Sequence, residues 1–250
     1  MKIEARGVGK HFHDKRGRDL PVLRDLELTV AGGEFYCLLG PNGCGKTTLL
    51  NLLAGFEPAD QGEIAIDGRL VTGPCPEYIM IMQSYDLFPW RTVLGNVEYG
   101  LEVRGWRRDK RRRQARELLA LVGLAGCEEQ HPRELSGGMR QRVAIARALA
   151  VEPQVLFMDE PFGALDALTR RRMQDELLRL WRSRRMTIVF VTHDINEALT
   201  LADTVAVLPS HPGPFREIIT LPQPRPRDLR DPACLQLRER LEQLLVATAP

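Results

Sequence analysis

The hydrophobic positions of this chain gather into short runs that hold polar residues mainly at their ends. Four such runs lie at 34–40, 78–83, 154–160 and 187–192. Apolar runs of this length without alternation are typical of strands buried on both faces of a parallel sheet. Two of the runs lead into helical patterns, one of which is predicted to begin at Lys46 and to end near Gly55. The pattern therefore predicts an α/β core.

Other parts of the chain predict an antiparallel portion and a helical insertion. Residues 63–71 and 204–209 read as further strands, and Asp67-Gly68 inside the first of them is a common hairpin turn. Between 92 and 150 the strand pattern is absent. In this region apolar residues recur at helical spacing, namely Ala115, Leu118, Leu119 and Val122. Gly123, which follows them, is a candidate C-cap of this helix.

These patterns predict one domain at 1–210, with a helical subdomain at about 91–150. Residues 211–250 are expected to form a short tail, rich in Pro and Arg, that ends in one helix at 234–245. Composition and charge mainly exclude some classes of partner and site. The net charge of +2 does not call for nucleic acid, and the five cysteines form no CxxC pair, so we expect reduced thiols and no zinc site. No apolar run has the length of a signal peptide core or a membrane span, so we expect a soluble protein whose membrane role would need a separate chain.

The segment GPNGCGKT at 40–47 fits the phosphate loop G-x-x-x-x-G-K-[ST], and it has the required setting between a strand and a helix. Its glycines let backbone amides wrap phosphates, Lys46 neutralises phosphate charge, and the Thr47 hydroxyl can bind Mg²⁺. We predict a nucleotide site here. Its phosphate-binding residues are Gly40, Pro41, Asn42, Gly43, Cys44, Gly45, Lys46, Thr47 and Thr48.

Polar residues follow three other buried runs, where ligands of open α/β sheets bind. Asp159 and Glu160 end the run VLFMDE, and we expect Asp159 to hold Mg²⁺ and Glu160 to polarise an attacking water. An acidic strand end at the surface is the alternative. His193 follows TIVFVT and is a candidate catalytic partner, although a lone His is more often structural. Gln83 ends YIMIMQ, and its amide is a third candidate ligand of Mg²⁺.

A second candidate anion site lies in LSGGMRQR at 135–142, where Ser136 is the predicted N-cap of a long helix. Free N–H groups and the helix dipole favour an anion at such a helix start. The phosphate loop, however, is already complete. The sequence therefore predicts two phosphate-binding devices in one domain.

The motif order resembles that of the nucleotide-binding subunit of an ATP-binding-cassette (ABC) transporter. The resemblance covers about residues 2–208 and is most specific in LSGGMRQ. It implies a P-loop NTPase (RecA-like) core, ATP as substrate and a head-to-tail homodimer in which each ATP lies between one phosphate loop and the partner's signature. It assigns Ser136, Gly137, Gly138 and Gln141 to the partner's ATP, and Asp166 to the dimer interface. It also assigns Phe12 to adenine stacking, with His11, His13 or simple core packing as alternatives.

The stretch QSYDLFPWRTVLGNV at 83–97 and the tail LPQPRPRD resemble the nitrate/sulfonate/taurine importer group. This resemblance implies a peripheral subunit on the cytoplasmic face of a bacterial-type membrane. Its partners would be a separate permease and, indirectly, a solute-binding protein, with no nucleic acid. We expect Leu87, Phe88 and Trp90 to contact the permease, with core packing as the alternative.

Rival interpretations remain at this point. The basic run at 104–116 could indicate nucleic acid or anionic lipid, but a solvated helix face explains it more simply. A non-transport cassette ATPase acting on nucleic acid or ribosomes is the main alternative function, although the chain lacks sustained heptads and a second cassette. A phosphate-loop kinase or GTPase would not carry LSGGMRQ.

Overall fold

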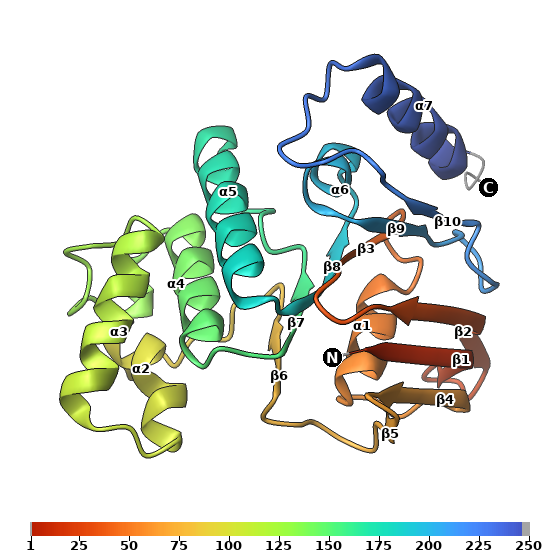
Figure 1. Cartoon of the computed structure of the whole chain (residues 1–250). Coiled ribbons are helices and arrows are strands. Elements are labelled where there is room, and N and C mark those ends of the chain that lie inside the picture. Colours follow the sequence, from red (N-terminus) through yellow and green to blue (C-terminus); the bar gives the residue numbers. More distant parts are fainter. Residues whose placement is uncertain (1, 247–250) are drawn as a thin grey trace.

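The computed structural model describes residues 2–246 and is organised around a six-stranded sheet (Figure 1). The strand order is β10-β9-β3-β8-β7-β6. All neighbours pair in parallel except β10, which runs antiparallel to β9 at the edge. The strands of this sheet are β3 (Phe35–Leu39), β6 (Tyr78–Ile81), β7 (Val155–Asp159), β8 (Thr187–Thr192), β9 (Thr204–Val207) and β10 (Glu217–Thr220). The predicted α/β fold class is confirmed.

A second sheet of four strands supplies the antiparallel portion, in the order β2-β1-β4-β5. Its strands are β1 (Ile3–His13), β2 (Asp19–Val30), β4 (Gln61–Ile66) and β5 (Arg69–Leu70). The predicted hairpin joins β4 to β5, and both Asp67 (φ 48°) and Gly68 (φ 75°) adopt the left-handed conformation that a type I′ turn requires. The sequence analysis named neither β1 nor β2.

Seven α-helices and one short 3₁₀ turn connect the strands within residues 2–246. They are α1 (Lys46–Ala54), α2 (Val93–Val103), α3 (Arg108–Leu121), η1 (Pro132–Glu134), α4 (Gly137–Ala150), α5 (Ala167–Arg184), α6 (Ile195–Leu201) and α7 (Pro232–Val246). As predicted, α1 ends at a left-handed Gly55. The cap residue of α3 is Val122, and the predicted Gly123 follows it with φ +69°.

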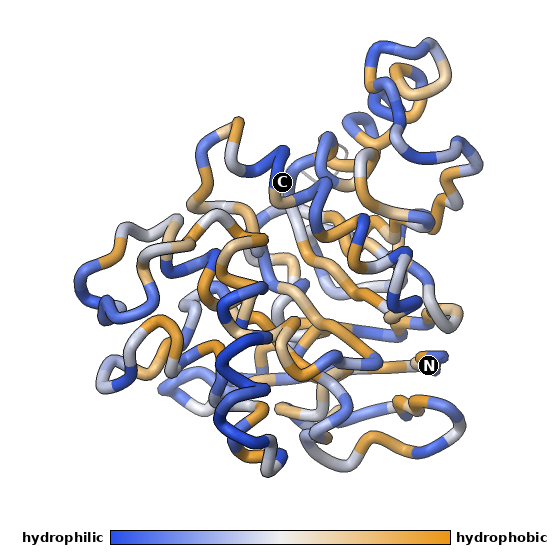
Figure 2. Tube along the Cα trace, turned by 60° about the vertical axis from the view of Figure 1, so that its left-hand side comes forward, coloured by the Kyte–Doolittle hydropathy of each residue, from blue (hydrophilic) through white to orange (hydrophobic). Residues whose placement is uncertain are grey.

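Helices α2, α3 and α4 gather at one end of the molecule, away from the antiparallel sheet (Figure 1). The first turns of α3 form a continuous hydrophilic stretch in Figure 2, because this part of the helix consists mainly of Arg and Lys. Most residues of the basic run are also exposed to solvent. Three arginines of the run turn back onto the protein. Arg111 and Arg112 form ion pairs with Glu98 or Glu102 on α2, and Arg104 donates to the carbonyls of Val151 and Pro76. The solvated-face interpretation of the basic run therefore agrees with the structure.

The six-stranded sheet separates two hydrophobic cores. Alternate residues of β3 point to opposite faces: Phe35 and Cys37 join the core built with α2 to α7, while Tyr36 and Leu38 join the core built with α1 and the antiparallel sheet. The protein thus has three layers, and α1 and α4 cover opposite faces of the central sheet.

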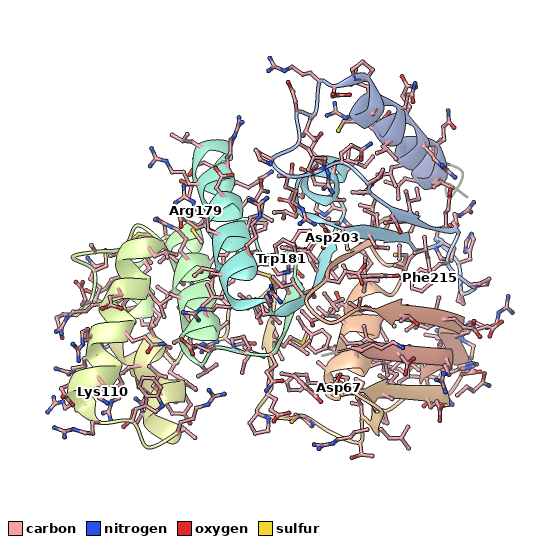
Figure 3. The ribbon with its side chains drawn as sticks, in the orientation of Figure 1. Asp67, Lys110, Arg179, Trp181, Asp203 and Phe215 are labelled. Carbon is pink, nitrogen blue, oxygen red and sulfur yellow. The ribbon has the colours of Figure 1, made fainter. Side chains whose placement is uncertain are left out.

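The segment after residue 210 packs tightly on the rest of the chain. Beyond the predicted helix it contributes β10, and Leu241 of α7 is fully buried. Arg227 donates to the carbonyls of Leu199 and Ala202 at 2.8 Å each. Trp181 and Asp203, labelled in Figure 3, are bridged by Arg225, whose guanidinium lies 4.5 Å from the indole ring. The division at residue 210 stays a prediction.

No helix within residues 2–246 combines the length and the apolar character needed to cross a membrane.

Candidate functional site

The phosphate loop follows β3, whose five residues are all buried. The loop backbone turns sharply at Gly45, which has a φ of 96°. A Cβ atom at Gly45 would lie 2.7 Å from Cδ2 of Leu23, and one at Gly40 would lie 2.7 Å from Sγ of Cys44. Side chains are therefore excluded on steric grounds, and the backbone amides stay accessible. Gly45 is also the N-cap of α1 and supplies no side-chain cap, so the helix start can bind an anion.

Lys46 is held inside this loop. Its Nζ donates to the carbonyl oxygens of Gly40 and Pro41 at 2.8 Å each, and the residue is only 5% exposed. Hydrogen bonds to these carbonyls compensate its buried charge. A phosphate group entering the loop would find this cation already in place.

Thr47 and Asp159 meet across the loop and the end of β7. The Thr47 hydroxyl donates to Oδ2 of Asp159 at 2.8 Å. Asp159 is buried, and this burial raises the pKa of its carboxyl; the Thr47 hydrogen bond and the Lys46 charge act against that rise. A hydroxyl and a buried carboxylate at this spot are the hard oxygen donors that Mg²⁺ takes alongside phosphate and water.

Glu160 and His193 lie beside this pair, because β7 and β8 are parallel neighbours and end at the same edge of the sheet. Nδ1 of His193 lies 3.1 Å from Oε1 of Glu160. Glu160 has a left-handed backbone (φ 45°), and its N–H donates to the carbonyl of Val191 on β8. The Glu160 side chain is 18% exposed and therefore reachable by water.

Two predicted site residues lie further out. Gln83 is exposed in the turn after β6. It lies at the same sheet edge as Asp159, because β6 is the parallel neighbour of β7. Phe12 is 39% exposed on β1, with Nζ of Lys10 5.3 Å from the ring centroid. The ring is thus free for stacking. The neighbouring strand β2 carries Leu23, whose Cδ2 would lie 2.7 Å from a Cβ atom at Gly45.

The LSGG segment forms a second, separate helix start. Ser136 is the N-cap of α4, as predicted, and its Oγ accepts from the Met139 N–H at 3.2 Å. A Cβ atom at Gly138 would lie 3.2 Å from the Ala164 carbonyl, so LSGG packs against the loop that carries Asp166. Asp166 is exposed and caps α5 through the Thr169 N–H at 3.0 Å; this hydrogen bond lowers the pKa of Asp166. Since α4 and α1 cover opposite faces of the sheet, LSGG belongs to a different surface from the phosphate loop.

Gln141 differs from its expected setting. It is fully buried, and its Nε2 lies 3.4 Å from the main-chain carbonyl of Glu160 in the same chain. This placement supports the backbone of Glu160 and does not present the amide to a partner's ligand. The helical pattern of the sequence could not indicate this contact, because it depends on how β7 packs against α4.

The loop at 85–91 presents Trp90 to solvent. Trp90 is 73% exposed, and its ring lies 5.5 Å from that of Phe88. Beneath it, the fully buried Asn96 accepts from the Phe88 N–H and donates to the carbonyls of Phe88 and Arg91. Arg147 also donates to two carbonyls of this loop. Core packing is therefore the wrong explanation for Trp90. Neither Asn96 nor Arg147 was predicted to hold this loop: Asn96 lies within the 83–97 stretch but received no role there, and Arg147 lies outside every motif.

Comparison with known proteins agrees with this geometry. A sequence profile of the family described as ABC transporter matches residues 23–163. The chain is 45% identical to a bicarbonate transport ATP-binding protein of Synechocystis, over 94% of this chain and 86% of that one. It is 50% identical to a taurine import ATP-binding protein of Yersinia pestis, over 80% and 79%. A solved ATP-binding cassette, dimeric and bound to ADP and phosphate, superposes with a TM-score of 0.81 at 30% identity, over 88% of this chain and 99% of that one.

Proposed function

This chain belongs to the ABC transporter family as an ATP-hydrolysing subunit, and we propose that two copies of it share each ATP molecule to drive uptake through a separate permease. The main support for a site shared between two chains is the placement of α1 and α4 on opposite faces of the central sheet. Because α1 and α4 pack into different cores, we propose that a phosphate held at the start of α1 is not bound by the start of α4 in the same chain. Two chains arranged head to tail bring one start of each kind together.

The chemistry follows from the residues at the sheet edge. Glu160 accepts a proton from a water molecule as the water oxygen attacks the γ-phosphorus and the bond to the β-phosphate oxygen breaks. ADP leaves with the bonding electrons. Lys46 and the N–H groups that begin α1 stabilise the charge on the phosphates. His193 holds Glu160 in position through the 3.1 Å contact.

Mg²⁺ fits the site through Thr47 and Asp159, whose side-chain oxygens already meet at 2.8 Å, and Gln83 is a further candidate ligand at the same edge. The ion would neutralise part of the phosphate charge. Within residues 2–246 no cluster of three or more His, Cys, Asp or Glu forms a self-sufficient metal site. This suits a cation that keeps waters and substrate phosphates in its shell.

We assign the remaining contacts by the same reasoning. Ser136, Gly137 and Gly138 are proposed to bind the γ-phosphate of the partner's ATP, and Asp166 to lie in the dimer interface. Gln141 acts within its own chain, through Glu160. Phe12 is proposed to stack on adenine, because its ring is exposed on the sheet that flanks the phosphate loop.

The transported solute is proposed to be a small anion or zwitterion, of the class that the relatives carry: bicarbonate, taurine and aliphatic sulfonates. One of these relatives is named as a transport protein and two as import proteins, which favours transport over a role on nucleic acid or ribosomes. We propose that the exposed Trp90 surface contacts the permease at the cytoplasmic face of the membrane. A solute-binding protein would act on the other side.

The test is Glu160→Gln, compared with Glu129→Gln, a matched change at an exposed position in the helical end of the molecule. Removing the base should lower ATP turnover by at least about 100-fold, while ATP binding persists because the phosphate loop is intact. Size-exclusion chromatography should then show a dimer only with Mg-ATP. The control should behave as wild type. Wild-type turnover by Glu160→Gln would remove this residue from the role of base.

A further inference from the structure

Arg170 lies in the first turn of α5, directly after the loop that carries Asp166. Its Nη2 donates to the main-chain carbonyl of Leu165 at 3.1 Å. The side chain is 33% exposed, so about two thirds of it is packed against neighbouring groups. One end of the guanidinium is therefore fixed to the backbone beside Asp166.

The rest of the guanidinium faces the segment that follows β8. Its Nη1 lies 3.7 Å from Oδ2 of Asp194, and its Nε lies 3.7 Å from Oε1 of Glu197. Asp194 caps α6 by accepting from the Asn196 N–H at 2.7 Å. Arg170 thus contacts both the Asp166 loop and the start of α6.

Glu197 continues this connection to the residues beside His193. Its carboxylate is 8% exposed and accepts from the Thr192 hydroxyl at 2.7 Å. The same hydroxyl accepts from the Asp194 N–H at 3.0 Å. Thr192 and Asp194 flank His193 in the chain. The Glu197 carboxylate therefore fixes the Thr192 hydroxyl, and this hydroxyl holds the Asp194 N–H on the other side of the histidine.

Charge makes this arrangement depend on Arg170. Burial raises the pKa of Glu197, whereas the Thr192 hydrogen bond and the Arg170 charge favour its ionised form. A buried carboxylate that loses its cation becomes costly and tends to rearrange or to bind a proton. The position of His193 is therefore sensitive to the Arg170 guanidinium.

We infer that Arg170 is a positioning residue that couples the Asp166 loop to His193, so that a change at the dimer interface is passed on to the contact between His193 and Glu160. This inference rests on the proposed function, in which Asp166 lies at the dimer interface. A shift of the Leu165 carbonyl moves the guanidinium, and the Glu197–Thr192 pair passes that shift to the backbone around His193. The contact between His193 and Glu160 then carries it to the base.

The competing explanation is an ion pair that only holds α5 against α6. Both explanations predict some loss of stability when Arg170 is replaced, so melting alone cannot separate them. They differ in catalysis, because a purely structural pair leaves turnover by the folded protein unchanged.

The first experiment compares Arg170→Gln with Arg171→Gln, the exposed neighbour on the same helix. Misplacing a catalytic group slightly can cost about 100-fold in rate. We expect kcat at saturating Mg-ATP to fall about 10- to 100-fold in Arg170→Gln, with KM for ATP within about 3-fold of wild type. Arg171→Gln should match wild type. Arg170→Lys should recover only part of kcat, because one ammonium cannot span the carbonyl and both carboxylates.

The second experiment is a double-mutant cycle with His193→Ala, followed by a sensitive radiometric assay. If Arg170 acts through the histidine, adding Arg170→Gln to His193→Ala should lower turnover no further. Independent, multiplying losses would overturn the inference, as would an unchanged kcat in folded Arg170→Gln. Should that variant fail to fold, Arg170→Lys and Glu197→Gln carry the same cycle. Failure of the proposed function looks different: Glu160→Gln would then keep its turnover.

Discussion

Replacing Trp90 with alanine tests whether the exposed aromatic surface serves a partner or the fold. Trp90 is 73% exposed, so only about a quarter of a surface of roughly 250 Å² is covered by the rest of the chain. At about 25 cal/mol per Å², the truncation forfeits about 1.5 kcal/mol. For a chain of this size that corresponds to a fall in Tm of about 3–6 °C.

The loop itself should survive this change. Asn96 and Arg147 bind its backbone, and neither contact passes through the indole. Since Trp90 is outside the ATP site, basal ATP hydrolysis by the purified subunit should stay within about 2-fold of wild type. Assembly with the permease should weaken, or hydrolysis should uncouple from uptake in reconstituted vesicles, because aromatic anchors contribute heavily to interfaces.

The measurements are Tm, basal ATPase activity and assembly, each made also on Trp106→Ala. Trp106 is a partly exposed tryptophan outside the 85–91 loop, so its variant should assemble normally. A core tryptophan would instead cost about 3–5 kcal/mol on truncation, lowering Tm by about 6–20 °C. A Trp90→Ala protein with such a loss and no basal activity would refute the reasoning, and so would wild-type assembly.

Three further predictions test other parts of the molecule. Lys46→Ala and Gly138→Asp should each be inactive alone, but mixing the two proteins should restore hydrolysis, because a mixed dimer contains one intact shared site; mixtures that stay inactive would contradict sharing. Burial raises the pKa of Asp159, so its ionised form destabilises the folded protein above that pKa. Asp159→Asn should therefore raise the Tm of the nucleotide-free protein. The increase in Tm should shrink as the pH falls toward the ordinary pKa of an aspartate. Calorimetry should also show that this variant gains no stability from Mg-ATP. Arg227→Met loses four hydrogen bonds to carbonyls, those of Leu199 and Ala202 at the end of α6 and those of Leu221 and Gln223. It should lower the free energy of unfolding by at least about 3 kcal/mol in denaturant titrations and leave KM for ATP unchanged.

Local signals in the sequence account for much of the fold. The four apolar runs became β3, β6, β7 and β8, the Asp67-Gly68 turn joined β4 to β5, and Ser136 capped α4. Each of these features depends on neighbours within a few residues. The register of β1 against β2 shifts at three places. These shifts interrupt the alternation of polar and apolar residues, so neither strand could be recognised from the sequence. Strand β10 is a four-residue edge strand that owes its structure to pairing with β9.

The site shows the same boundary between local and distant information. Motifs identified the Thr47–Asp159 and Glu160–His193 pairs, which the sheet brings together. Arg170 and Glu197 were not identified, because their meeting depends on how α5 packs beside β8 and α6. Gln141 received a role at a partner's ligand, although packing against β7 buries it. The sequence therefore predicts which polar groups gather at the sheet edge better than which groups hold them in place.

The placement of the two helix starts on opposite faces also has a kinetic consequence. If two copies share each ATP as proposed, a free subunit carries two half-sites and completes neither, so its hydrolysis should depend on encounters between copies and fall steeply on dilution. A permease that holds two copies side by side raises their effective concentration to about the millimolar range, as short tethers do. Assembly with the permease would then switch on ATP hydrolysis. Subunits made in excess of the permease would hydrolyse little cellular ATP.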